Sequence, residues 1–555
     1  MRNIRYCTAD IWNRKEEIQM DGKLSEIAKV NGIEISLAEA CFLGFFILMS
    51  VTKGLGLYAG QKLFELLVIP AFLLAIVKIL ITPYTGRQWA VQILFLILTA
   101  VVFYNSHERG ILFLAFTVLG MKDVSVKKVF HIGLWVWSLC SIVLSIFSFF
   151  RLEHTIYRVH AKMGLGHIFR WSLGFTHPNI LHITYLALCA YILYELGDNY
   201  RFRNFVYLMA GNLLIFLYSV SYTGFGIVTL LLVGCLYVRI RPRFCIVEKI
   251  LANLVLPICL ILSFVAPFYL YHPRYAYKVQ KLNFILNTRI WLAEQFLRSE
   301  YRSLFGADVS QVVKSSMTMD NSYVWGYINY GLIPITIIIL GYFALLFYDT
   351  HKQKTRELVI LVCFLAAGWT EPLLFNTSFK NITLIFLGSF LFLQKEGAKE
   401  YCLLPGMQRT VVVPFAALPD RMWADVRGIW SVCGKKVLGC CALGAALGIV
   451  LCAVFYTVPT GYVVPRFYTD GLEETSVYVI GEDDPDYAGW KIMNYSDADT
   501  PMQLVQDDAV TLETVRYYVG NALIGGFFGA IIGTVYCGRK QSGTDEQHRG
   551  KVKMV

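Results

Sequence analysis

Long apolar windows recur along almost the whole chain, and they restrict what it can fold into. A helix needs roughly 17 to 25 predominantly apolar residues to cross a bilayer. Because loops and open sheet edges are not tolerated in hydrocarbon, such windows predict an all-α polytopic membrane protein with about 14 transmembrane helices. The candidate spans are residues 34-52, 63-82, 88-105, 110-121, 129-150, 179-196, 204-220, 224-240, 250-269, 323-347, 358-375, 381-394, 436-457 and 515-536.

Composition supports this class, since 56% of the residues are hydrophobic and only 16% are charged, well outside the globular average. The windows at 110-121 and 381-394 are short, so a lower span count stays open if either is re-entrant. Residues 1-33 are polar and lack the short apolar core and cleavage site of a secretory signal. We therefore expect this segment to stay in place.

The basic residues predict an orientation. Connecting segments such as MKDVSVKK, NYRFRN and RIRPRF alternate with less basic ones, and the positive-inside rule then places both termini in the cytoplasm. The predicted organisation is a cytoplasmic segment (1-33), a membrane domain (34-394) with long outer loops (151-178 and 271-322), a cytoplasmic connector (395-435), a two-span module (436-537) enclosing an acidic outer segment (458-514), and a basic cytoplasmic tail (538-555).

The first outer loop is rich in cations and histidines, with four Lys or Arg against one Glu. For Arg158 the simplest interpretation is contact with lipid phosphates. Arg170, in FRWSLGF, lies among aromatic and small residues that favour a folded anion site, and Arg suits bidentate recognition of a diphosphate. In HPN, His177 is either a proton acceptor or, like Asn179, a cap for the helix that Pro178 begins.

The second outer loop contains seven Lys or Arg and four acids. Within it, NTRIWLAEQFLRSEYRSL predicts an amphipathic helix. Arg289 opens this helix, whose amino end favours an anion, and Glu294 lies inside it. The predicted apolar face consists of Ile290, Leu292, Phe296, Leu297 and Leu304.

Two further acids lie at the ends of predicted spans. Asp320, followed by Asn321, is either a simple helix cap or a general base whose pKa is set by partial burial and a neighbouring Arg. Glu371, in GWTEPLLFN, ends another span. An unpaired acid at a membrane is costly, so we expect a functional partner for Glu371.

Several chemistries lack their motifs. The chain has no HExxH, no Walker-type GxxxxGK[ST] and no GxGxxG in a usable context, which argues against metalloprotease and ATPase activity. No His pair has the helical spacing with an acid that is typical of zinc sites, so we expect no metal and no cofactor. The fourteen cysteines fall in spans or predicted cytoplasmic segments, which disfavours a disulfide framework. We expect no nucleic-acid partner.

A set of short motifs occurs in a fixed order: FRWSLGFTHPN, YSVSYTGFG, NTRIWLAEQFL, SLFGADVS, MDNSYVWGYINYG and EPLLFN followed by FKN. In these pieces residues 34 to 394 resemble the O-antigen and capsular polysaccharide polymerase family, which is related to the O-antigen ligases. The resemblance implies a GT-C-like helical bundle. It also implies an enzyme that joins undecaprenyl-diphosphate-linked oligosaccharides on the outer face of the bacterial cytoplasmic membrane, without nucleotide sugar or metal.

The resemblance also implies site residues. The ligases often have a histidine before an Asn-x9-Gly pattern, where this chain has Asp320 before Asn321 and Gly331, so a polymerase is favoured over a ligase and the base is left open. The implied roles are diphosphate binding by Arg170, Arg289 and Arg158, proton acceptance by Asp320, Glu294 or His177, and support from Asn179, Asn321 and Glu371.

The carboxy-terminal module weakly resembles a polysaccharide co-polymerase of the chain-length determinant class, with twelve acids and two bases in its outer segment. Its small-residue spacing favours close helix packing, either within the chain or in self-association. A flippase and a chain-length regulator of the same pathway are expected partners, beside the lipid bilayer. The alternative functions are a lipid-linked oligosaccharide flippase or other secondary transporter, O-antigen ligase-like glycan transfer, and a scaffold of envelope assembly.

Overall fold

The computed structural model describes residues 33–150, 156–162, 166–286, 288–298, 300–309, 319–393, 399–413, 418–455, 490–493 and 503–552. These form two compact units. One unit comprises residues 41–157 and 170–408, and the other residues 1–40, 158–169 and 409–555. Residues 1–32 of the predicted segment 1-33 and most of the acidic segment 458-514 lie outside the described residues.

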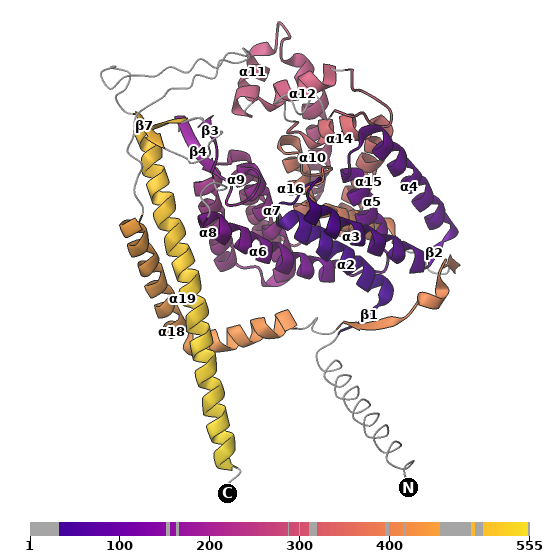
Figure 1. Ribbon diagram of the computed structural model, residues 1–555. Coiled ribbons are helices and arrows are strands. Elements are labelled where there is room, and N and C mark those ends of the chain that lie inside the picture. The colour runs from indigo at the N-terminus through magenta and orange to yellow at the C-terminus, as the bar shows by residue number, and fades with distance from the viewer. Residues whose placement is uncertain are drawn as a thin grey trace, which may run out of the picture. The chain divides into compact units, whose positions relative to one another are not determined.

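Each of the fourteen predicted windows contains helix in the structure, and most of these helices are labelled in Figure 1. Ten of the described helices, namely α2, α3, α4, α6, α7, α9, α10, α15, α18 and α19, are long and apolar enough to cross a membrane, which makes this a multi-pass membrane protein. The helices of the larger unit are α2 (Leu37–Gly54), α3 (Lys62–Ile81), α4 (Gly86–Ser106), α5 (Gly110–Gly120), α6 (Val126–Phe150), α7 (Pro178–Leu196), α8 (Phe202–Ser219), α9 (Tyr222–Ile240), α10 (Ile246–Phe264), α11 (Ala276–Ile285), α12 (Arg289–Arg298), α14 (Ser322–Tyr330), α15 (Leu332–Lys352), α16 (Thr355–Thr370) and α17 (Thr383–Leu391).

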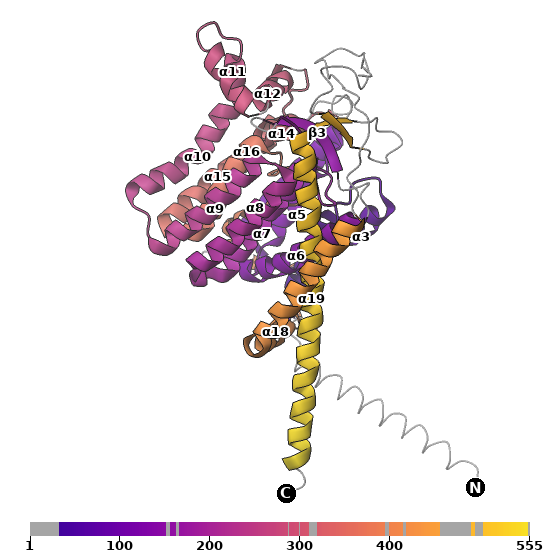
Figure 2. The same cartoon turned by 90° about the vertical axis from the view of Figure 1, so that its left-hand side faces the viewer.

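Helices α7, α8 and α9 pack against one another, and α16 contacts both α9 and α10 (Figure 2). Consequently the first residues of α7, α9 and α14 and the last residues of α8 and α16 meet at one end of the larger unit. The lipid-facing sides stay apolar, with Leu66, Leu94 and Ile261 exposed. This arrangement is typical of a bundle whose solvent on most sides is hydrocarbon.

One predicted span is broken. The window 323-347 forms two helices, α14 and α15, because Gly331 between them has a φ of 86°, a backbone region that side-chain-bearing residues avoid. A Cβ at Gly331 would overlap the backbone of Phe305 and Gly306. Gly331 was expected inside a continuous helix, and this prediction was wrong because loop backbone packs directly against Gly331.

The amphipathic helix in the second outer loop is confirmed as α12, although it is shorter than the motif. Ile290, Phe296 and Leu297 are buried, as expected for its apolar face. Leu304 was placed on that face wrongly, because the helix ends at Arg298 and Leu304 is exposed. In Figure 1, α11 and α12 lie beyond the end where α10 finishes and α14 begins.

The smaller unit is built around α18 (Leu418–Phe455) and α19 (Asp507–Val552), which pack side by side. Gly444 packs on the backbone of Gly525, and Gly529 on that of Cys440. Small residues let two helix backbones approach this closely, so the predicted packing within the chain is confirmed. The predicted boundary at 435/436 falls inside α18, and the predicted tail at 538 continues α19.

Short strands complete the fold. In the larger unit, β2 (Tyr84–Thr85) pairs antiparallel with β5 (Glu400–Tyr401). In the smaller unit, β1 (Ile33–Ser36) pairs with β6 (Thr410–Val413), and β7 (Trp490–Met493) with β8 (Gln503–Gln506), all antiparallel. The first outer loop folds as β3 (Ile156–Lys162) and β4 (Gly166–Trp171).

Candidate functional site

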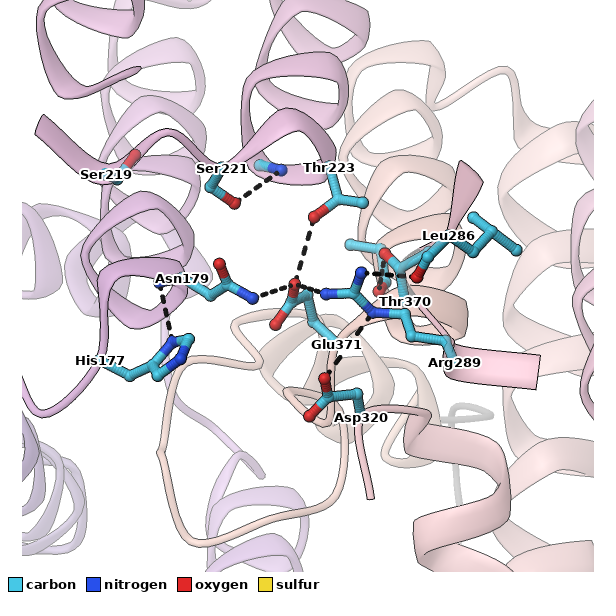
Figure 3. Close-up of polar contacts among 12 residues, drawn as sticks. His177, Asn179, Ser219, Ser221, Thr223, Leu286, Arg289, Asp320, Thr370 and Glu371 are labelled. Carbon is cyan, nitrogen blue, oxygen red and sulfur yellow. Dashed lines mark hydrogen bonds and ion pairs between the residues drawn. The ribbon is translucent and has the colours of Figure 1, made fainter. Parts of the chain in front are cut away.

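Glu371 is the centre of a buried polar site in the larger unit. It follows the last residue of α16 directly, and it is only 5% exposed. Its Oε1 accepts hydrogen bonds from Asn179 Nδ2 at 3.0 Å, Thr223 Oγ1 at 3.2 Å and Arg289 Nη2 at 2.7 Å (Figure 3). One carboxylate oxygen therefore ties together the starts of α7, α9 and α12.

Arg289 connects this carboxylate to a second acid. Its Nη1 donates to the carbonyl oxygen of Leu286 at 3.1 Å, and its Nε lies 3.9 Å from Asp320 Oδ2. At that distance Nε makes no hydrogen bond, and it has no acceptor among the described residues. The Arg289 side chain is 9% exposed whereas that of Asp320 is 32% exposed. Asp320 is thus the more accessible end of the arrangement.

Arg170 joins the same arrangement from the other side. It is 2% exposed, and its Nε donates to the carbonyl oxygen of Ser219 at 2.7 Å. Its Nη2 donates to Asn179 Oδ1 at 2.5 Å. Since the amide of Asn179 also donates to Glu371, both arginines are linked through one acid. We call this set the carboxylate network: Arg170, Asn179, Thr223, Arg289, Asp320 and Glu371.

Local structure fixes the acidic side of the carboxylate network. Asn321 is the N-cap of α14, and its Oδ1 accepts from the backbone N–H groups of Tyr323 and Val324. The next residue, Ser322, donates from Oγ to the carbonyl oxygen of Glu371 at 2.6 Å and accepts from the N–H of Leu374. Glu371 is consequently held by its backbone as well as by its side chain.

Arg170 donates a hydrogen bond to the turn between α8 and α9. The buried side chain of His182 contacts the same turn. His182 Nδ1 lies 2.9 Å from Ser219 Oγ, and its Nε2 lies 2.8 Å from Asn212 Oδ1. A Cβ on Gly224 would come within 2.6 Å of the His182 ring. Glycine at 224 is therefore what lets the first turn of α9 approach this close.

Burial raises the pKa of Glu371, and the charge of Asp320 raises it further, while the guanidinium groups of Arg289 and Arg170 oppose the rise. A buried carboxylate with three donors and two nearby arginines is stabilised in its charged form by those partners alone. Chemically, the carboxylate network offers two oriented cations and one accessible acid. An incoming anion would compete with Glu371 for Arg289.

Most of the sequence-predicted residues meet in this site, namely Arg170, Asn179, Arg289, Asp320 and Glu371. Asp320 is not the helix cap that the sequence allowed, since Asn321 takes that position. His177 does cap α7, accepting from the N–H of Asn179 at 3.1 Å.

Glu294 is not part of the network. Glu294 pairs with Arg298 one turn later on α12 and accepts from Gln295. Arg158 lies in β3, and its side chain is outside the described residues.

The sequence did not indicate Ser219, Thr223 or Ser322 as site residues. The first two belong to YSVSYTGFG, which was quoted only as a motif. A hydroxyl-rich turn between two apolar spans is the signal that points to them, because such a turn places several hydroxyl groups at one membrane surface.

Across the part of the chain that the structure describes, no group of three or more His, Cys, Asp or Glu residues is placed to hold a metal ion. Comparisons of the chain with protein-family models, with curated proteins and with solved structures find no match.

Proposed function

We propose that this protein is a membrane glycosyltransferase that joins oligosaccharides carried on polyprenyl diphosphate, and that it acts as a polysaccharide polymerase in the bacterial cytoplasmic membrane. The observation that carries the proposal is Arg289, which is buried, has an Nε without an acceptor among the described residues, and faces the partly exposed Asp320. With Arg170 it supplies two guanidinium groups, which suit diphosphate oxygens.

The charges of the larger unit support an outward-facing site. The turns at the end opposite the carboxylate network are strongly basic, and the positive-inside rule would place them in the cytoplasm. These turns and the helix ends beside them carry Lys122, Lys127, Lys128, Arg201, Arg203, Arg239, Arg241, Arg243, Lys352, Lys354 and Arg356. On this orientation the network lies at the outer headgroup level.

The reaction needs no external energy source, because a diphosphate-linked sugar is already activated. An acceptor hydroxyl attacks the anomeric carbon, the bond from that carbon to the diphosphate oxygen breaks, and the hydroxyl proton passes to a carboxylate. Polyprenyl diphosphate leaves with the electron pair of the broken bond. Cations near the leaving group stabilise its developing charge, and a positioned carboxylate accepts the proton.

Among the candidate bases, Asp320 fits this role best. Glu371 is occupied by three donors, Glu294 is paired with Arg298, and His177 caps α7. Asp320 is partly exposed and lies 3.9 Å from the cation that would hold the leaving group. In this scheme Glu371 keeps the two arginines oriented in the absence of substrate, and Asn179 and Thr223 position Glu371.

The test is elongation by purified protein in nanodiscs, supplied with synthetic polyprenyl-diphosphate oligosaccharide and no nucleotide or metal. The wild-type protein is expected to produce a ladder of longer glycans. Arg289→Met and Asp320→Asn are each expected to slow elongation by about 100-fold or more, the scale of losing one stabilising group in a transition state. Lys281→Met, an exposed cation of the same loop, is the matched control.

A flippase gives the opposite pattern. It would move the lipid-linked oligosaccharide between leaflets without lengthening it. If several different repeat units are supplied and none is elongated, the polymerase is refuted. If elongation occurs but Arg289→Met and Asp320→Asn elongate as fast as Lys281→Met, the protein is a polymerase and the assignment of Arg289 and Asp320 to its active site is refuted.

A further inference from the structure

Lys380 is a buried cation that the proposed reaction does not use. It lies in the connector between α16 and α17, only 5% exposed, with its Nζ 5.2 Å from the centre of the Trp137 ring. Among the described residues it has no ion-pair partner. An uncompensated buried ammonium is costly, so its retention calls for a physical reason.

Lys53, in the last turn of α2, is a second buried cation, close enough for its charge to act on Lys380. Its side chain is also buried, at 8% exposure, and its Nζ lies 4.6 Å from the centre of the Phe64 ring. It donates one hydrogen bond, to the carbonyl oxygen of Leu57 at 3.2 Å. Burial, and to a smaller extent the charge of Lys53, lower the pKa of Lys380 to about 7.

Trp137 of α6 adds a third donor. The residue is 1% exposed, and its Nε1–H has no hydrogen-bond acceptor in the described part of the chain. Lysine and tryptophan side chains can only donate hydrogen bonds. Lys380 thus lies over the Trp137 ring and is acted on by the charge of Lys53, and neither Lys380 nor the Trp137 Nε1–H has an acceptor among the described residues. An anion with several oxygens would complete such an arrangement.

The backbone around Lys380 is held firmly. Phe379 has a φ of 56°, a strained value for a non-glycine residue, and its ring packs on Phe45 and Phe46 at 6.1 and 5.6 Å between centroids. On the other side, Asn381 Nδ2 donates to Tyr342 Oη and to the carbonyl oxygen of Leu374. Strain that is retained by packing on both sides is typical of a pre-organised site.

Glycine brings the helices of this site together. A Cβ on Gly54, the last residue of α2, would come within 2.9 Å of Cys140 and 3.8 Å of Trp137, both on α6. Gly54 therefore allows the end of α2, with Lys53, to lie directly against α6. The donors come from three separate elements that close packing fixes in place.

We propose that Lys380, Lys53 and the Nε1–H of Trp137 form an oxyanion site that binds a phosphate-bearing group, separate from the carboxylate network. The site does not depend on the proposed function. If that function holds, a second phosphate site has a direct use, because joining two lipid-linked oligosaccharides brings two diphosphate groups to one enzyme. A phospholipid headgroup or soluble diphosphate offers the same chemistry.

Native mass spectrometry of the full-length protein in detergent tests the proposal with four probes: polyprenyl diphosphate, phosphatidylglycerol, inorganic diphosphate and neutral polyprenol. Lys380→Met is expected to remove one bound phosphate compound, or to weaken it about tenfold or more, the scale of losing a charged hydrogen bond. The exposed Lys399→Met makes the same charge change and is expected to bind normally. Which of the three phosphate probes is lost identifies the source.

Arg289→Met separates this proposal from the proposed function. If both hold, Arg289→Met loses one bound polyprenyl diphosphate and Lys380→Met loses the phosphate compound of the oxyanion site; if only the oxyanion site exists, Lys380→Met loses that compound and Arg289→Met binds every probe as the wild type does. Binding of every probe unchanged by Lys380→Met, or equal dependence of neutral polyprenol on Lys380, would overturn it. If the variant does not fold, reductive methylation of Lys380 in wild-type protein serves instead: protection by the bound probe supports the site, and equal labelling with and without probes refutes it.

Discussion

The pair formed by Arg289 and Glu371 makes a strong prediction about stability. Replacing Arg289 by Met leaves the carboxylate of Glu371, which is 5% exposed, with only the neutral donors Asn179 and Thr223. Removing one partner of a buried ion pair destabilises a protein by about 3–5 kcal/mol. Glu371→Gln in turn leaves the buried guanidinium of Arg289 without its carboxylate partner, although Asp320 at 3.9 Å still offsets part of the charge of Arg289.

The double variant should be less destabilised than the sum of the two single variants, because it leaves neither charge stranded. We expect a coupling free energy of about 2–3 kcal/mol. The measurement is the free energy of unfolding in detergent for the wild type, both single variants and the double variant. A coupling below about 0.5 kcal/mol would show that the 2.7 Å contact does not carry the stabilisation assigned to it.

The same cycle has a predicted pH dependence. Burial raises the pKa of Glu371 from its ordinary value of 4.5, and Arg289 opposes that rise, so Arg289→Met raises the pKa further. Between 4.5 and the raised pKa the folded protein then binds more protons than the unfolded chain, and its stability falls as the pH rises. The destabilisation by Arg289→Met should therefore be larger at pH 8 than at pH 5, and an equal loss at both would contradict the reasoning.

Further predictions follow from other residues. The pKa of Lys380 is lowered from 10.5 to about 7, so between these two pH values the unfolded chain binds more protons than the folded protein. The free energy of unfolding of the wild type should therefore increase as the pH rises through that interval, and Lys380→Met should show no such increase in denaturant titrations. Gly331→Ala should lower the free energy of unfolding by about 1–3 kcal/mol in the same titrations, because Gly331 has a φ of 86°. An unchanged denaturation midpoint would refute the close packing of loop backbone against Gly331. Gly529→Leu should separate α18 from α19 and lower the melting temperature more than Gly526→Leu, whose nearest contact is 3.4 Å.

The helices could be predicted from the sequence because the length and apolarity of a span are local properties. The break at Gly331 could not, since it depends on Phe305 and Gly306, which reach it from the preceding loop. Leu304 fell on the wrong face for a related reason. Its spacing continues the pattern of α12, but the backbone has already left the helix at Arg298.

The site was predictable only in part. Glu371 was expected to have a functional partner because an unpaired acid at a membrane is costly, yet its partners come from α7, α9 and α12, which no local pattern relates. Thr223 contributes one hydroxyl from a turn. From sequence alone, Glu294 and Asp320 were equal candidates for the proton acceptor. The structure distinguishes them because Arg298 pairs with Glu294.

The glycine between α14 and α15 has a consequence for how the protein tolerates its membrane. A continuous helix would act as a lever, so that any change in the tilt of α15 with bilayer thickness would move Asp320. Because the chain turns at Gly331, the nine residues of α14 are anchored to Glu371 through Ser322 instead. Hydrophobic mismatch changes the tilt of spanning helices. We therefore expect the break to let the tilt of α15 change with lipid length with little effect on the distance between Asp320 and Arg289.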